Sequence, residues 1–208
     1  MADEQPRGYL PKQRRSERTR ARLVEAGKRL FSEEGYHRTS SKKIAREAGV
    51  ATGSFYNHFR DKKQLLLELN RLYMASIHAR VAELLAQADF GAPASDGRTV
   101  VREIIRQAVA LHNLSPELHR EISALTYTDE EFGDLGRQEH QRSVDLLLAR
   151  LQPHAHTLRV RDLPAAAKVV VQAMEAVIHS VRFFPGGEDE ERLLDALGDM
   201  VFRYLYED

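Results

Sequence analysis

The most distinctive chemistry of this chain lies in a short segment, residues 52–58, whose side chains are mostly small or polar. If Phe55 and Phe59 point into a core, the opposite side of a helix carries no aliphatic and no acidic residue. That side would consist of Thr52, Gly53, Ser54, Tyr56 and Asn57. Short polar side chains and an exposed glycine suit a helix in the major groove of DNA, where base edges must be approached closely. An ordinary helical hairpin with a solvated polar face would show the same pattern.

Residue types that bind phosphate surround this segment. They are Thr39, Ser40, Ser41, Lys42, Lys43, His58 and Lys62. Helix N-termini and lysines are common phosphate contacts, which fix the register on DNA without reading its sequence. The pattern therefore predicts a nucleic-acid interface within residues 39–62.

Other kinds of chemistry find little support. The sequence has no nucleophile elbow, glycine-rich phosphate loop, HExxH motif or paired-carboxylate signature, so we expect neither enzymatic activity nor a cofactor. His154 and His156 could ligate a metal, but no third ligand is near and no metal site is predicted. The chain contains no cysteine, which excludes disulfides and thiolate chemistry.

The elements that position these residues are expected to be helices, because apolar residues recur with helical spacing and no segment has the alternation of a strand. The predicted fold is all-α, with about nine helices. We expect them at residues 16–34, 41–48, 52–59, 61–88, 99–113, from 116 after a Ser115 cap, 128–151, 164–184 and 188–206. Ser16 and Thr128 are expected N-caps, and Gly35 and Gly49 are expected helix ends. Residues 90–98 and 153–162 are expected to be loops.

Charge is distributed unevenly along the chain. Residues 1–63 carry 16 Lys and Arg against 8 Asp and Glu, whereas the rest carries 15 against 23. A basic segment joined to an acidic body indicates a polyanionic partner for one end only. The N-terminus has no apolar signal segment, and no stretch is apolar enough to span a membrane, so we expect a cytoplasmic protein with no membrane partner.

The segment around the short helices resembles the DNA-binding domain of the tetracycline-repressor-like (TetR/AcrR) family. The residues that carry the resemblance are Thr39, Ser40, Ile44, Ala45, Ala48, Gly49, Val50, Gly53, Tyr56, His58, Phe59, Lys62 and Leu65. The resemblance covers about the first 65 to 70 residues. It implies that Lys42, Thr52, Gly53 and Tyr56 lie near bases. It also implies that Ser41, Ser54, Tyr56, Asn57, His58 and Lys62 contact phosphates, although Asn57 is equipped to reach a base as well.

Residues 1–15 are polar and contain proline, which predicts a flexible basic N-terminal arm. The resemblance implies that a helix-turn-helix domain (16–63) and a helical effector-binding and dimerisation domain (64–208) follow. The segment 164–184 is apolar on all sides and needs two apolar neighbours, as at a dimer interface, although a helix buried within its own chain is the alternative. The expected interface residues are Val170, Met174, Val177, Val181, Leu193, Leu197, Val201 and Tyr204.

An effector pocket is expected in the larger domain. Its candidate residues are His78, His112, His119, Tyr127, Phe132, His140, Met174, His179 and Phe183. The leading hypothesis is a homodimeric repressor that binds a palindromic operator and is released by a small molecule. The alternatives are a constitutive or architectural DNA-binding protein without effector, and a helical enzyme of unfamiliar type. The helical body, which is far larger than DNA binding requires, disfavours the constitutive or architectural protein. The missing catalytic signatures disfavour the enzyme.

Overall fold

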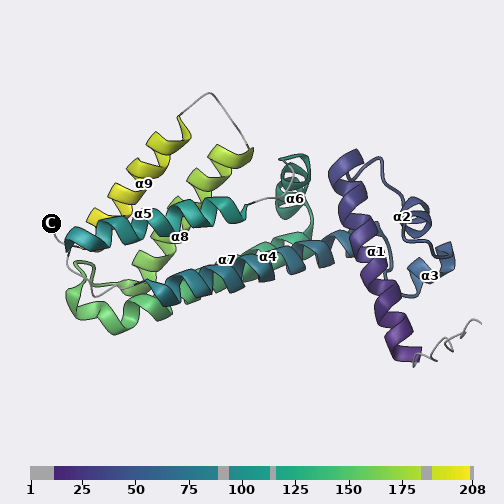
Figure 1. The fold of residues 1–208 in the computed structure, drawn as a ribbon, viewed down its shortest axis with the longest axis horizontal. Coiled ribbons are helices and arrows are strands. Elements are labelled where there is room, and N and C mark those ends of the chain that lie inside the picture. Colours follow the sequence, from purple (N-terminus) through teal and green to yellow (C-terminus); the bar gives the residue numbers. More distant parts are fainter. Residues whose placement is uncertain (1–11, 89–93, 113–115, 184–188, 207–208) are drawn as a thin grey trace, which may run out of the picture. The chain divides into compact units, whose positions relative to one another are not determined.

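The computed structural model describes residues 12–88, 94–112, 116–183 and 189–206. Within these ranges the chain forms nine α-helices, one short 3₁₀ helix and no strand, which confirms the predicted all-α class (Figure 1). The chain folds into two compact units, Met1–Asn70 and Arg71–Asp208, within which most contacts between residues are made. No helix in the described ranges is long and apolar enough to cross a membrane.

The first unit consists of α1 (Lys12–Glu34), α2 (Ser41–Glu47), α3 (Thr52–Tyr56) and the start of α4 (Lys62–Gln87). One apolar side chain or more from each helix lies in its core. Leu23, Phe31, Ile44, Phe55 and Leu65 are all fully buried there. Helices α1 and α4 pack closely at Gly27, where an added Cβ would lie 2.5 Å from Leu65 Cδ2. A side chain at this position would therefore require the buried Leu65 side chain to shift.

The turns of this unit depend on two glycines with positive φ. Gly35 follows α1 with φ 85°, and Gly49 follows α2 with φ 62°, a region that side chains disfavour. Both positions confirm the predicted helix ends. The predicted N-cap Ser16 is wrong, because α1 already begins at Lys12. Residues 12–15 are lysine, glutamine and two arginines, all of which favour a helix, so nothing stops it from starting before Ser16.

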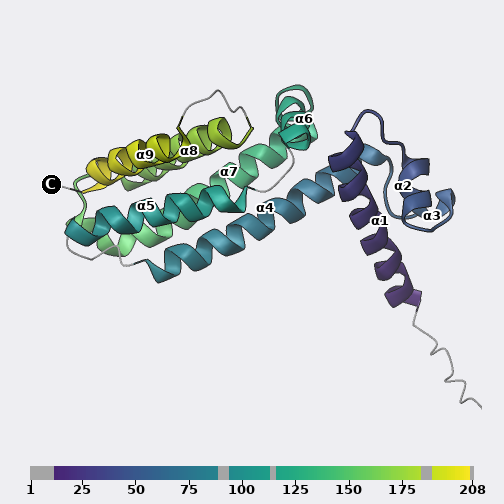
Figure 2. The ribbon, with the colours of Figure 1, turned by 45° about the horizontal axis from the view of Figure 1, so that its top comes forward.

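The second unit contains the remainder of α4 and the other helices. These are α5 (Ala94–Leu111), α6 (Pro116–Thr128), α7 (Glu130–Leu151), η1 (Gln152–Thr157), α8 (Leu163–Phe183) and α9 (Glu190–Leu205). Helix α5 packs along α9, α7 packs along both α6 and α8, and α8 lies beside α9 (Figure 2). Their shared core is mainly aliphatic, with Ile105, Leu151, Ala166 and Leu205 almost completely buried.

Three boundaries of the second unit differ from the sequence prediction. Helix α5 begins at Ala94, inside the predicted loop, and η1 occupies part of the predicted linker. The cap of α7 is Asp129 rather than Thr128, because the Asp129 carboxylate accepts hydrogen bonds from the N–H groups of Glu131 and Phe132. Thr128 instead ends α6, where its hydroxyl donates to Ala124 O. The predicted cap Ser115 lies outside the described residues.

Candidate nucleic-acid interface

The orientation of α3 is fixed by two buried aromatic rings. Phe55 is fully buried and Phe59 is 2% exposed, and their ring centroids lie 5.8 Å apart. Because both rings point into the core, the opposite side of α3 must face solvent. Tyr56 is accordingly 57% exposed, an unusual position for a large aromatic side chain.

The residues predicted to face DNA are largely accessible. Ser40, Lys42, Thr52, Gly53, Tyr56 and Asn57 are exposed, and Ser41, Ser54 and His58 are partly buried. Ser40 is also the N-cap of α2, because its hydroxyl oxygen accepts a hydrogen bond of 3.2 Å from Lys43 N. Contacts between these residues and DNA remain a prediction, with which their exposure is consistent.

A groove of about 580 Å³ adjoins the start of α3. It is lined by Ser40, Lys42, Lys43, Arg46, Val50, Ala51 and Thr52. Sequence reasoning did not single out Arg46, which is exposed and follows Lys42 by four residues on the same helix. Residues spaced by four lie on one helix face, and that spacing could have identified Arg46.

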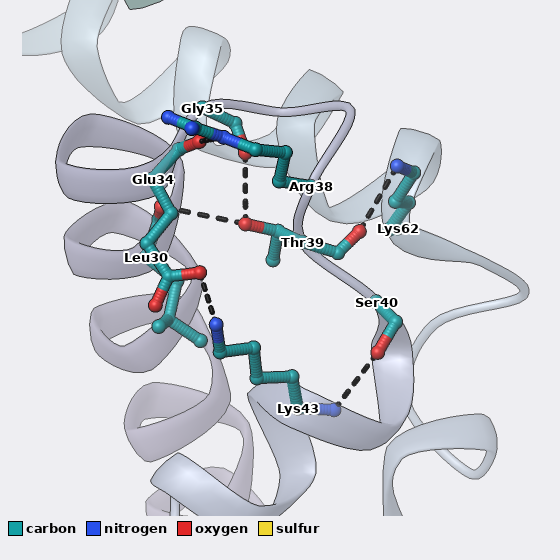
Figure 3. A network of polar contacts seen from close by, with 8 residues as sticks. All are labelled: Leu30, Glu34, Gly35, Arg38, Thr39, Ser40, Lys43 and Lys62. Carbon is teal, nitrogen blue, oxygen red and sulfur yellow. Dashed lines mark hydrogen bonds and ion pairs between the residues drawn. The ribbon is translucent and has the colours of Figure 1, made fainter.

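The prediction that the Thr39 side chain contacts phosphate is wrong. Thr39 is only 2% exposed, and its hydroxyl donates to Gly35 O at 2.8 Å and approaches Leu30 O at 3.4 Å. A hydroxyl bonded in this way needs no water, so a threonine can be buried in the turn between α1 and α2. Figure 3 shows Thr39 at the centre of the polar contacts of this turn.

Lys62 holds the same turn. Its ammonium donates a hydrogen bond of 3.0 Å to Thr39 O (Figure 3). The same ammonium donates to Tyr36 O at 2.7 Å and lies 4.2 Å from the centroid of the Tyr36 ring. Lys43 also acts inside the unit, where it forms an ion pair with Glu34. These internal partners give Lys62 a positioning role, and a direct phosphate contact remains a separate prediction.

Four candidate effector residues come together in the second unit. His112 at the end of α5, His119 on α6, and His179 and Phe183 on α8 are in ring contact, and His119 stacks on Phe183 with centroids 3.5 Å apart. Burial lowers the pKa of His119 to about 3 and that of His179 to about 4, with neighbouring histidines contributing to both shifts. Burial also lowers the pKa of His112. The cluster is therefore a set of neutral imidazoles at neutral pH.

The other candidates lie apart from this cluster. His78 on α4 is 3% exposed and contacts Ser143 at 2.9 Å, while His140 pairs with Glu175 at 3.0 Å. Phe132 is fully buried, and Met174 packs against the aliphatic core. Tyr127 is 91% exposed, so the prediction that it lines a pocket is wrong. No group of three or more His, Asp or Glu side chains in the described residues has the arrangement of a metal site.

Three of the residues predicted for a dimer interface belong instead to the core of their own subunit. Val170, Leu197 and Val201 are each 3–4% exposed, because the inner faces of α8 and α9 pack within the second unit. The large apolar side chains left on the outside of these helices are Val169 and Met200, each 49% exposed, and Tyr204, 38% exposed. Met174, Val177, Val181 and Leu193 are partly buried.

The first unit has the features of a helix-turn-helix: two short helices packed at their turn, with a polar, accessible face on the second. Comparison with known proteins agrees. The pattern described as "Bacterial regulatory proteins, tetR family" matches residues 23–69. The pattern "Tetracyclin repressor-like, C-terminal domain" matches residues 96–205.

Individual relatives span nearly the whole chain. The "HTH-type transcriptional repressor AcnR" of Corynebacterium diphtheriae is 30% identical over 193 residues, covering 88% of this chain and 90% of the relative. The structure of a TetR-family transcriptional regulator from Mesorhizobium loti matches with a TM-score of 0.73 and 19% identity, covering 92% of this chain and 98% of that one. Thermus thermophilus FadR, a TetR-family repressor in complex with lauroyl-CoA, matches with a TM-score of 0.63 and 21% identity, covering 89% and 94%.

These matches define a DNA-binding transcriptional regulator. The chain belongs to the tetR family of bacterial regulatory proteins.

Proposed function

We propose that this regulator is a repressor that binds a palindromic operator as a homodimer and is released by a small-molecule effector. The observation that carries the proposal is the exposed polar face of α3, with Thr52, Gly53 and Tyr56 beside the basic groove of Lys42 and Arg46. Side chains of these types can reach base edges, while the adjacent cations bind phosphate. The relative from C. diphtheriae is a repressor, which supports the direction of regulation.

Dimerisation is supported by the outer surfaces of α8 and α9. Val169, Met200 and Tyr204 form an apolar set on two neighbouring helices, and burying them against a second copy would remove that surface from water. A two-fold dimer presents two α3 helices, which would read two half-sites about 34–36 Å apart or a multiple of that distance.

The effector is proposed to bind in the second unit and to act through α4. This helix contributes its first residues to the DNA-binding unit and the rest to the second unit. Binding of DNA and binding of the effector can therefore both change its position, which is the physical requirement for coupling the two sites. The lauroyl-CoA complex of T. thermophilus FadR, a protein of similar fold, supports a ligand-binding role. The neutral cluster of His112, His119 and His179 supplies hydrogen-bonding groups for such a ligand.

The first experiment is selection of bound duplexes from a random-sequence DNA pool with the full chain. The proposal expects an inverted repeat, bound by two copies of the chain. A single asymmetric half-site, or no enriched sequence, would overturn the operator and dimer assignments.

The effector is tested next, by screening small molecules for thermal stabilisation and measuring the affinity of each hit with and without saturating operator. Linkage requires an effector that releases DNA to bind more weakly to the DNA complex, by the same factor as it weakens DNA binding. If every stabilising ligand binds with the same affinity in the presence and in the absence of operator, release by an effector is refuted. A constitutive DNA-binding protein would then be favoured.

A further inference from the structure

Helix α1 begins four residues before the predicted cap, and its first turns carry three arginines that the predicted site does not include. Arg14, Arg15 and Arg18 are exposed, and none of them has a hydrogen bond or ion pair from its side chain to the described residues. Two arginines further along α1 have internal partners instead. Arg20 pairs with Glu68, and Arg29 pairs with Glu47.

The three arginines share one face of α1. At 100° per residue, positions 14, 15 and 18 fall within about 100° of one another, and Arg22 falls inside the same sector. Arg22 Nη2 donates to Gly49 O at 3.2 Å, which places this sector beside the turn that leads into α3. The exposed arginines therefore continue along α1 from the helix-turn-helix turn itself.

The reach of this surface follows from helix geometry. Arg18 lies about 6 Å along the helix axis before Arg22, and Arg14 about 12 Å before it. Each strand of B-DNA carries about one phosphate per 3.4 Å of axis, so about 12 Å of duplex presents about three phosphates on a strand. Glu17, the acidic residue of these first turns, lies outside the sector and accepts a hydrogen bond from Gln13.

We propose that Arg14, Arg15 and Arg18 form a second DNA-binding surface, which contacts the phosphate backbone flanking the half-site read by α3. This inference rests on the proposed operator binding and extends it. The partner is duplex DNA beyond the recognised bases, bound through charge and without readout of its sequence. This surface increases the affinity for operator DNA and lengthens the stretch of duplex that the bound protein covers.

The test is the salt dependence of operator binding by the triple variant R14Q/R15Q/R18Q. The matched control K28Q/R71Q/R161Q removes three charges from exposed residues whose side chains likewise make no hydrogen bond or ion pair to the described residues. Neutralised phosphate contacts contribute about 0.9 each to the slope of log affinity against log salt, so losing three per subunit lowers the slope of a dimer by about 5. A decrease of about 2 to 5 is expected for the triple variant, with a loss of affinity of about tenfold or more, and no change of slope for the control.

A second arm shortens the DNA. On a duplex trimmed to the recognised palindrome, the wild type and the triple variant should bind alike, because the flanking phosphates are gone. Equal slopes of the wild type and the triple variant on the long duplex would overturn the inference while leaving operator binding intact. Failure of the wild type to prefer the operator over scrambled DNA would instead overturn the proposed function.

Discussion

Replacing Lys62 by methionine separates two roles for this residue. Methionine keeps an unbranched apolar stem but cannot donate the hydrogen bonds that the ammonium makes to Tyr36 O and Thr39 O. It also removes the cation from its place 4.2 Å from the Tyr36 ring centroid. The turn between α1 and α2, which precedes the cap Ser40, would lose its tie to the start of α4.

The expected loss of stability follows from these contacts. A hydrogen bond to a charged group contributes about 1.5–3 kcal/mol, and a partly exposed cation–π contact about 0.5–1 kcal/mol. Water can solvate the released carbonyls, and the lysine no longer has to be partly desolvated, so the net loss is smaller than the sum. We expect the free energy of unfolding to fall by about 2–3 kcal/mol. Urea denaturation followed by circular dichroism measures it, with the exposed Lys28→Met as a control that changes little.

Salt dependence then distinguishes positioning from direct phosphate contact. If Lys62 only positions the turn, Lys62→Met weakens operator binding by the same factor at every salt concentration. A direct contact would reduce the slope by about 0.9 per subunit. The positioning role is refuted if the slope falls by that amount while the stability of the protein is unchanged.

Further predictions concern the second unit. Met200→Glu should convert the proposed dimer to a monomer at micromolar concentration in sedimentation equilibrium, whereas Tyr127→Glu, on an exposed side chain of α6, should not. If both variants sediment as dimers, the α8–α9 surface is not the dimer interface. Because the pKa values of His119 and His179 are lowered to about 3 and about 4 in the folded protein, the unfolded chain binds protons first as the pH falls below 6.5. The free energy of unfolding is therefore highest above pH 6.5 and decreases as the pH falls toward these folded-state values. Allowing for partial exposure, the unfolding free energy should fall by about 1 kcal/mol per histidine between about pH 7.5 and pH 5. His119→Phe should reduce this pH dependence, and an identical pH profile would contradict the burial of a neutral imidazole.

The predictable part of the fold came from local signals. Helical spacing of apolar residues predicted an all-α chain, and Gly35 and Gly49 marked two helix ends because few other residues adopt positive φ. Placing Phe55 and Phe59 inward was enough to predict which side of α3 is accessible. The residue types on that side predicted a nucleic-acid interface, and the family resemblance then implied which of these residues lie near bases and which contact phosphates.

The sequence predictions failed where the burial of a side chain depends on which group it contacts in the folded chain. Thr39 has a polar hydroxyl, but two carbonyl groups of its own turn allow it to be buried. Val169 and Val170 are chemically identical neighbours on an apolar helix, so periodicity could not say which of them faces its own subunit. The phosphate contact predicted for Lys62 stays a prediction, and the carbonyl groups that this residue also binds could not be inferred from its charge.

The meeting of the three histidines could not be predicted either, because His112, His119 and His179 lie on three helices. Their proximity depends on how α5, α6 and α8 pack, and the spacing of residues along one helix does not determine that packing.

The most direct test of operator recognition by α3 is a specificity ratio. Affinities for the selected palindrome and for a scrambled duplex of equal length are measured at one salt concentration, for the wild type and for Tyr56→Ala. The wild type should prefer the palindrome by about 10³-fold or more. Tyr56→Ala should weaken palindrome binding by about 1–3 kcal/mol per affected base and change scrambled binding much less. Equal wild-type affinities for the two duplexes, or a ratio untouched by Tyr56→Ala, would contradict recognition through this face.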